Sequence, residues 1–369
     1  MKFFKNFLLL SFLLVSIPAF ANLPYHPIQL PRDDAGHLSN VPYPVKNLSE
    51  WWYYSGKLTT QEDRHFGYYL IIFNITKYVL GKKITVPLYT LQLTDIDNNK
   101  VYGTKIYYPN KETEFSTQQL AITLGKNKEV TLKKNAGIYL IDSTTQTKQG
   151  VTVKLFLTMK PTRNPLLVGG KGIIPMGNDT NSYYYSFTRL ATAGSIQIDN
   201  KIYKINPSES SSWMDHQWGD FMLSTDNQWF WTSIRLDNNI DINLTNVLDS
   251  SKQPGKIKMA NIMMPDGRFL FTTNFFVKPI NHDLHQYPLT YDIEMQSLQL
   301  KMHITSLADH QDCNIYWEGI SKVDGTYQGK PIHGFAYVEN TSRYGWPLSL
   351  FIEKINTSME QFGVLLRNL

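Results

Sequence analysis

The chain has 369 residues, a formal net charge of +5, 13% aromatic residues, 18% charged residues and one cysteine. This composition is too apolar and aromatic for a disordered chain, and one cysteine excludes both an intrachain disulfide framework and a cysteine-rich zinc module. The positive charge is small and scattered, so we expect no nucleic-acid partner.

The first 21 residues are typical of a secretory signal peptide. Lys2 and Lys5 precede a short apolar run at 8–15, and residues 19–21 (Ala-Phe-Ala) have the pattern of a cleavage site. The run is too short to span a bilayer, although a membrane anchor is the alternative. We expect cleavage after Ala21, a periplasmic or secreted protein, and no stable membrane span after signal-peptide removal.

Most later segments are short apolar or alternating runs separated by turn residues. Such runs occur at 66–73, 88–93, 151–159, 229–236, 298–303 and 335–339. Their spacing predicts an all-β chain, either a sandwich or a barrel. The length suggests two domains, at 22–200 and 201–345, followed by a tail at 346–369 that contains a short helix candidate (352–366).

Several catalytic motifs are missing from the sequence. It contains no G-x-S-x-G nucleophile elbow, H-E-x-x-H zinc motif, P-loop or EF-hand loop, so we expect neither a serine hydrolase nor a metallohydrolase. His282 and His285 flank Asp283, but prolines on both sides favour an exposed loop over a metal site. We therefore expect no metal and no cofactor.

The first unusual segment is an aromatic run that follows Glu50. A strand sends alternate side chains to opposite faces, so Trp51 and Tyr53 point one way while Trp52 and Tyr54 point the other. One pair can pack in the core while the other lines a cavity or a seam between domains. Glu50 lies at the edge of this wall, where we expect burial to raise its pKa.

The second segment, 213–219, places an acid, an imidazole and two indoles within seven residues. In an extended strand His216 and Trp218 share one face, while Asp215 lies on the other. An imidazole beside an indole could transfer a proton to an apolar substrate or orient a water, and the indole could stabilise positive charge. The alternative is a plain barrel-closing strand whose polar atoms bond to neighbouring backbone.

Two further segments place a carboxylate beside aromatic residues, Trp317-Glu318 and Tyr337-Val338-Glu339. For each, the alternative is a strand end that carries a surface acid. We name Asp215 and His216 as candidate catalytic residues, with Asp215 as the acid. The candidate ligand-binding residues are Trp218, Trp213, Trp51, Tyr53, Glu50, Trp317, Glu318 and Glu339.

The motifs, in this order, resemble the AttH-like proteins, which group with carotenoid 1,2-hydratases and are often labelled predicted secreted hydrolases. The resemblance covers about residues 30 to 340 and rests on His37, 50–58, 66–68, 170–172, 182–186, 213–219, 316–319 and 334–339. It implies two tandem lipocalin-like β-barrel domains and a pocket in or between them. In the hydratases a His-x-Trp pair is implicated, which matches His216 and Trp218, and a Tyr-x-Asp pair, which 240–249 lacks.

The resemblance implies a hydrophobic small-molecule ligand or substrate, such as a lipid, a polyene or a polyketide-like compound. It also implies hydration, isomerisation or cyclisation by an acid in an aromatic pocket, without metal or organic cofactor. A non-catalytic lipocalin-like carrier of the same kind of ligand is the alternative, and a purely structural protein is a third reading. The sequence does not fix the oligomeric state.

Overall fold

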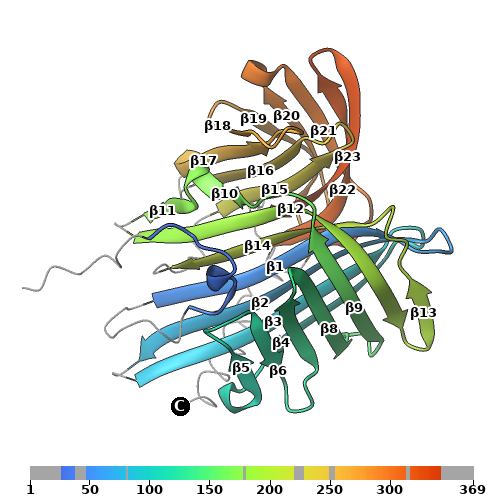
Figure 1. Cartoon of the computed structure of the whole chain (residues 1–369). Coiled ribbons are helices and arrows are strands. Elements are labelled where there is room, and N and C mark those ends of the chain that lie inside the picture. The colour runs from blue at the N-terminus through green and yellow to red at the C-terminus, as the bar shows by residue number, and fades with distance from the viewer. Residues whose placement is uncertain are drawn as a thin grey trace, which may run out of the picture.

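The computed structural model describes residues 26–37, 47–79, 82–177, 180–219, 228–248, 254–312 and 316–341. Within these ranges the chain is all-β, with short 3₁₀ turns and no α-helix, and its strands form two curled antiparallel half-barrels (Figure 1). The all-β, lipocalin-like prediction is therefore confirmed. The described part has no helix that is long and apolar enough to cross a membrane. Both the predicted signal peptide and the tail with its helix candidate lie outside the described residues.

The first sheet has fourteen strands. Its main path runs β4-β3-β2-β1-β14-β12-β9-β8-β7-β6-β5, and β10, β11 and β13 pair with β12. The strands are β1 (Asn47–Thr59), β2 (His65–Val79), β3 (Lys82–Asp95), β4 (Lys100–Tyr107), β5 (Thr113–Phe115), β6 (Ala121–Leu124), β7 (Val130–Asn135), β8 (Ile138–Gln146), β9 (Thr152–Pro161), β10 (Leu166–Leu167), β11 (Ile173–Gly177), β12 (Thr180–Ile198), β13 (Lys201–Lys204) and β14 (Ser211–Gly219).

The second sheet has nine strands in the order β18-β17-β16-β15-β23-β22-β21-β20-β19. They are β15 (Gln228–Leu236), β16 (Asp241–Leu248), β17 (Pro254–Met263), β18 (Phe269–Thr272), β19 (Phe276–His282), β20 (Pro288–Met295), β21 (Leu300–Ser306), β22 (Trp317–Tyr327) and β23 (Lys330–Asn340). The first sheet thus extends to Gly219, so 201–219, assigned from the sequence to the second domain, pairs within the first sheet.

Alternation of side chains explains how each sheet curls around a core. Along β9, Val153, Leu155, Leu157 and Met159 point inward and are fully buried, while the residues between them are exposed or half-buried. These four belong to the core of the first half-barrel, and a separate core fills the second. The period-two pattern in the sequence therefore reports real inward and outward faces.

Strand β14 positions the candidate site because both of its faces are buried. It pairs with β1 on one side and β12 on the other, which places His216 beside Trp52 and Tyr185. Eight of its nine residues, from Ser212 to Gly219, are buried without the usual exposed alternate positions. One face therefore looks into the first half-barrel, and the other looks toward the second sheet.

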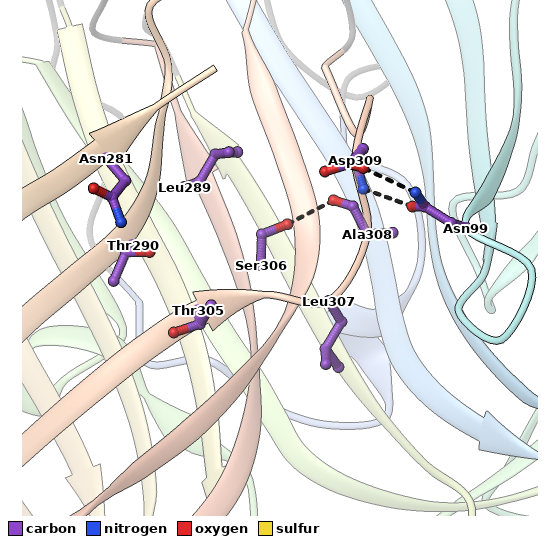
Figure 2. A pocket seen from close by; sticks show the side chains of 9 residues that line it. All are labelled: Asn99, Asn281, Leu289, Thr290, Thr305, Ser306, Leu307, Ala308 and Asp309. Atoms are coloured by element: carbon purple, nitrogen blue, oxygen red, sulfur yellow. Dashed lines mark hydrogen bonds between the residues drawn. The ribbon is translucent and has the colours of Figure 1, made fainter.

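The two sheets are also tied together at their edge, where a hollow is lined mainly by polar side chains (Figure 2). Asn99, in the turn after β3, donates its side-chain amide to Asp309 at 2.8 Å and accepts from the Asp309 backbone N–H at 2.8 Å. Nearby, Gln92 donates to the backbone carbonyl of Glu318 at 2.8 Å. We call the Asn99–Asp309 pair the latch.

Candidate functional site

The structure separates the ten residues predicted for the site into three places. Glu50, His216 and Trp218 lie inside the first half-barrel, and Trp317 lies in the core of the second. The others lie between the two sheets, in or beside a cluster of aromatic residues, and are Trp51, Tyr53, Trp213, Asp215, Glu318 and Glu339. The predicted opposition of Trp51 and Tyr53 to Trp52 and Tyr54 is confirmed.

A fully buried carboxylate holds two imidazoles inside the first half-barrel. Glu50 Oε1 lies 2.8 Å from His37 Nδ1 and 3.0 Å from His216 Nε2. The backbone N–H of His37 also donates to both Glu50 oxygens at 3.1 Å. Glu50 and His216 are on paired strands, but His37 comes from the segment after η1 (Arg32–Asp34), which packs against the sheet through the Gly36 N–H and the carbonyl of Ser116. We call His37, Glu50 and His216 the imidazole centre.

Two adjacent acids of η1 support this centre. Asp33 Oδ1 lies 3.7 Å from His37 Nε2 and is held by Arg32 at 2.6 Å. Asp34 turns inward, where it accepts hydrogen bonds from Tyr185 at 2.8 Å, Tyr139 at 2.6 Å and Lys134 at 2.7 Å. Tyr185 in turn lies 3.4 Å from Nδ1 of His216, so both imidazoles have a polar neighbour on their second nitrogen.

Aromatic rings enclose the two imidazoles. The His37 ring stacks on Trp218 with a centroid distance of 4.0 Å and an interplanar angle of 2°. His216 lies between Trp52, at 4.6 Å, and Trp218, at 4.7 Å. Tyr183 continues the stack on Trp218 at 5.1 Å. The indole faces carry partial negative charge, so the cage favours a cation over an anion.

The pKa values of the three groups in the imidazole centre are shifted in different directions. Burial disfavours the charged form of Glu50, but the hydrogen bonds and charges of both imidazoles outweigh it and lower the pKa of Glu50 to about 2. The prediction of a raised pKa for Glu50 is therefore wrong, because its partners are cationic or hydrogen-bond donors. Burial also opposes charge on His37, yet Asp33 and Glu50 raise its pKa to about 9. Burial prevails at His216, whose pKa is lowered.

Two groups in the described residues have the donor types of a metal site. The ligand atoms of His37, Glu50 and His216 all lie within 4.8 Å of one another, and this donor set suits zinc. Here, however, hydrogen bonds to one shared carboxylate already satisfy the facing nitrogens of both imidazoles. The other group joins Asp283, His285 and Asp312 at a surface where the neighbouring Leu284 is 88% exposed, consistent with the predicted exposed loop.

On the opposite face of β14, Asp215 anchors the seam between the sheets. It accepts hydrogen bonds from Ser186 at 2.5 Å, Tyr184 at 2.6 Å and the Trp213 indole at 2.6 Å. The Tyr184 hydroxyl also accepts from Trp231 of the second sheet at 3.0 Å. Burial raises the pKa of Asp215 to about 6, although its three donors oppose the rise.

Two glutamates face this seam from the second sheet. Glu318 and Glu339 stand opposite each other on β22 and β23, and Trp231 is the cross-strand neighbour of Glu339. Burial raises the pKa of Glu339 to about 7 and that of Glu318 well above its ordinary value. We call Asp215, Glu318 and Glu339 the seam acids. Unlike Glu50, they have no imidazole beside them in the described residues.

Sequence reasoning missed the partners of the imidazole centre. His37 and Tyr185 contributed only to the family resemblance, and Asp33 and Asp34 were not singled out. A usable signal existed, since residues 32–37 (Arg-Asp-Asp-Ala-Gly-His) place four ionisable groups just before the aromatic strand. Only the pairing of β1 with β14, together with the hydrogen bonds from His37 to Glu50, reveals that this segment and His216 meet.

Comparison with known proteins agrees with this architecture. A putative AttH from Nitrosomonas europaea superimposes with a TM-score of 0.72 at 19% identity, covering 88% of this chain and all of that one. Kievitone hydratase from Nectria haematococca superimposes with a TM-score of 0.58 at 16% identity, covering 79% and 88%. Both similarities establish the fold.

Similarity in sequence points the same way. Dehydratase asqC of Emericella nidulans is 24% identical over 199 residues, which are 50% of this chain and 56% of that protein, so the chain spans about half of that relative. A family model described as AttH-like matches residues 21–343, nearly all of the predicted mature chain. The chain therefore belongs to the AttH-like family.

Proposed function

We propose that the protein is a hydratase-type enzyme that adds water to, or removes it from, a small hydrophobic molecule at the imidazole centre. One observation carries the proposal: two imidazoles of opposite proton affinity share the buried Glu50 carboxylate inside an aromatic cage. The hydratase and dehydratase among its relatives support the same reaction class.

The chemistry of the centre suits this reaction. Addition or removal of water needs a proton donor and a proton acceptor within reach of one carbon–oxygen bond. The raised pKa of His37 keeps it charged at neutral pH, so its imidazolium can give a proton and its neutral ring can then take one, while the lowered pKa of His216 keeps that imidazole neutral beside it. The indoles of Trp52 and Trp218 stack on the two imidazoles and favour positive charge on the rings that they cover.

The reaction can be tested with kievitone, the compound in the name of a structural relative. Purified protein is incubated with it, and products that have gained or lost one water are followed by mass spectrometry. We expect Glu50→Gln to lower turnover about 100-fold or more, because it removes the charge that holds both imidazoles. Glu114→Gln, on an exposed strand position, is the matched control.

Two outcomes would count against the proposal. Equal turnover by wild type and Glu50→Gln would remove the imidazole centre from the reaction. Native mass spectrometry that finds an unchanged hydrophobic molecule bound one to one, without turnover, would instead favour the carrier.

We also propose that the chain is exported, on the basis of residues 1–21. Intact mass of the protein from the periplasm or medium tests this. Loss of 21 residues is expected, and a full-length chain in the cytosolic fraction would contradict it.

A further inference from the structure

The two imidazoles of the centre differ in their access to solvent. The His37 side chain is 21% exposed, whereas that of His216 is 0% exposed and lies between two indoles. Of the two imidazoles, His37 is therefore the one that solvent reaches. His216 already has a polar neighbour at both ring nitrogens, Glu50 on one and Tyr185 on the other.

The outer nitrogen of His37 is placed to donate. Its Nδ1 is bound to Glu50 at 2.8 Å, but its Nε2 lies 3.7 Å from Asp33 Oδ1, which is longer than a good hydrogen bond. A substrate oxygen near Nε2 would therefore meet a donor that Asp33 engages only weakly. The parallel stacking on Trp218 fixes the direction in which this nitrogen points.

We infer that His37 is the substrate-facing catalytic residue, and that its Nε2–H passes a proton to the hydroxyl of an alcohol that forms a stabilised carbocation, such as a tertiary or allylic alcohol. The inference rests on the proposed function and deepens it. Glu50 and His216 are then positioning residues, because they fix the ring of His37 and reach the substrate only through it.

The step balances without a co-reactant. The imidazolium gives its Nε2 proton to the hydroxyl, the carbon–oxygen bond breaks with its electron pair on oxygen, and water leaves. The neutral Nε2 then takes a proton from the neighbouring carbon, and the carbon–hydrogen pair becomes the double bond. His37 ends as it began, and the reverse sequence is hydration.

Charge around His37 suits the cationic intermediate. Once the proton has left, the carboxylates of Asp33 and Glu50 on either side of the ring give the site a net negative charge. A carbocation is therefore favoured at this position, so alcohols that ionise readily suit the site better than primary alcohols do.

Two substitutions of His37 distinguish proton transfer by Nε2 from hydrogen bonding at the same position. His37→Asn keeps an amide near the position of Nδ1, where it can still contact Glu50, but removes Nε2. His37→Gln places an amide nitrogen near Nε2, which can hydrogen-bond a hydroxyl but cannot transfer a proton. His333→Asn, on an exposed strand of the second sheet, is the control.

Activity is measured with linalool, a tertiary allylic alcohol, whose dehydration gives myrcene and water, and with kievitone. We expect His37→Asn and His37→Gln to lower kcat about 100-fold or more, with KM for His37→Gln nearly unchanged, while His333→Asn keeps wild-type rates. More than a tenth of wild-type kcat in folded His37→Asn would overturn the inference and leave the proposed function standing.

A second measurement needs no substrate. ¹⁵N NMR of the ring nitrogens should find His37 protonated on both nitrogens at pH 7.5. A spectrum in which the His37 ring is neutral at that pH would also overturn the inference. A doubly protonated His37 in a wild-type protein that converts neither compound would instead count against the hydratase function, and the inference would fall with it.

Discussion

Asp215 and His216 are neighbours in sequence, yet they belong to two buried sites with opposite electrostatics. The imidazole centre keeps Glu50 ionised, because hydrogen bonds from two imidazoles outweigh the cost of burial. The seam acids lack such a partner, and burial raises the pKa of all three. At these two sites the presence of an imidazole partner, rather than burial alone, separates the ionised carboxylate from the carboxyls whose pKa is raised.

The largest effect should come from breaking the imidazole centre. Glu50→Ala removes the acceptor of both imidazoles and leaves the charge of His37 with one fewer counter-ion, so we expect a loss of about 3–5 kcal/mol in the free energy of unfolding. Urea denaturation at pH 7 measures it. Glu114→Ala, at an exposed strand position, should change stability by less than about 0.5 kcal/mol. Equal losses in the two variants would refute the comparison.

At the seam, Asp215→Ala should cost less. Three donors, on Ser186, Tyr184 and Trp213, would lose their acceptor, but no buried charge would be left behind, so we expect about 1–3 kcal/mol. The same denaturation experiment applies, with the exposed Asp142→Ala as the matched control. A loss greater than that of Glu50→Ala would reverse the order of the two sites.

The pH dependence of stability should sharpen the contrast, because the carboxyl groups of the two sites respond in opposite directions. The pKa of Glu339 is raised to about 7 in the folded protein, so its stabilising contribution is present below about pH 4.5 and lost as the pH rises to 7. The pKa of Glu50 is lowered to about 2, so its contribution is present above pH 4.5 and lost as the pH falls toward 2.

His37 should add a third window. Its pKa is raised to about 9, so its contribution is fully present below about pH 6.5 and disappears as the pH rises through 9. Denaturation midpoints between pH 2 and 10 test all three windows. Glu339→Gln should reduce the fall of the denaturation midpoint between pH 4.5 and 7 and leave its fall near pH 9 unchanged. If the variant shows the same fall between pH 4.5 and 7 as the wild type, the assignment of that window to Glu339 is contradicted.

The smallest effect should come from the latch, which is exposed and contains no residue of either site (Figure 2). Asn99→Ala should cost less than about 1 kcal/mol. Because the Asn99 side chain makes both hydrogen bonds, the double variant Asn99→Ala/Asp309→Ala should lose little more stability than Asn99→Ala alone. Calorimetry of the two single variants and the double variant measures the coupling energy between the two residues. Strictly additive losses would show that the pair does not act as one unit.

Much of the architecture could be predicted from the sequence. Period-two alternation predicted the strands, and the aromatic run after Glu50 predicted which of its side chains face opposite ways. The partners could not be predicted, because they are set by pairing over long distances. His37 and His216 meet only where β1 lies beside β14, so the sign of the Glu50 pKa shift depended on contacts that no local pattern encodes.

The alternation along β14 also has a consequence for folding. A slip of one residue in its pairing would exchange Asp215 and His216 between faces. The imidazole would then stand among the seam acids, and the carboxylate would face Glu50, where two negative charges would meet without solvent. A register shift of one residue would therefore destabilise both sites at once. Asp215 and His216 together favour the native pairing of β14 as the barrel closes.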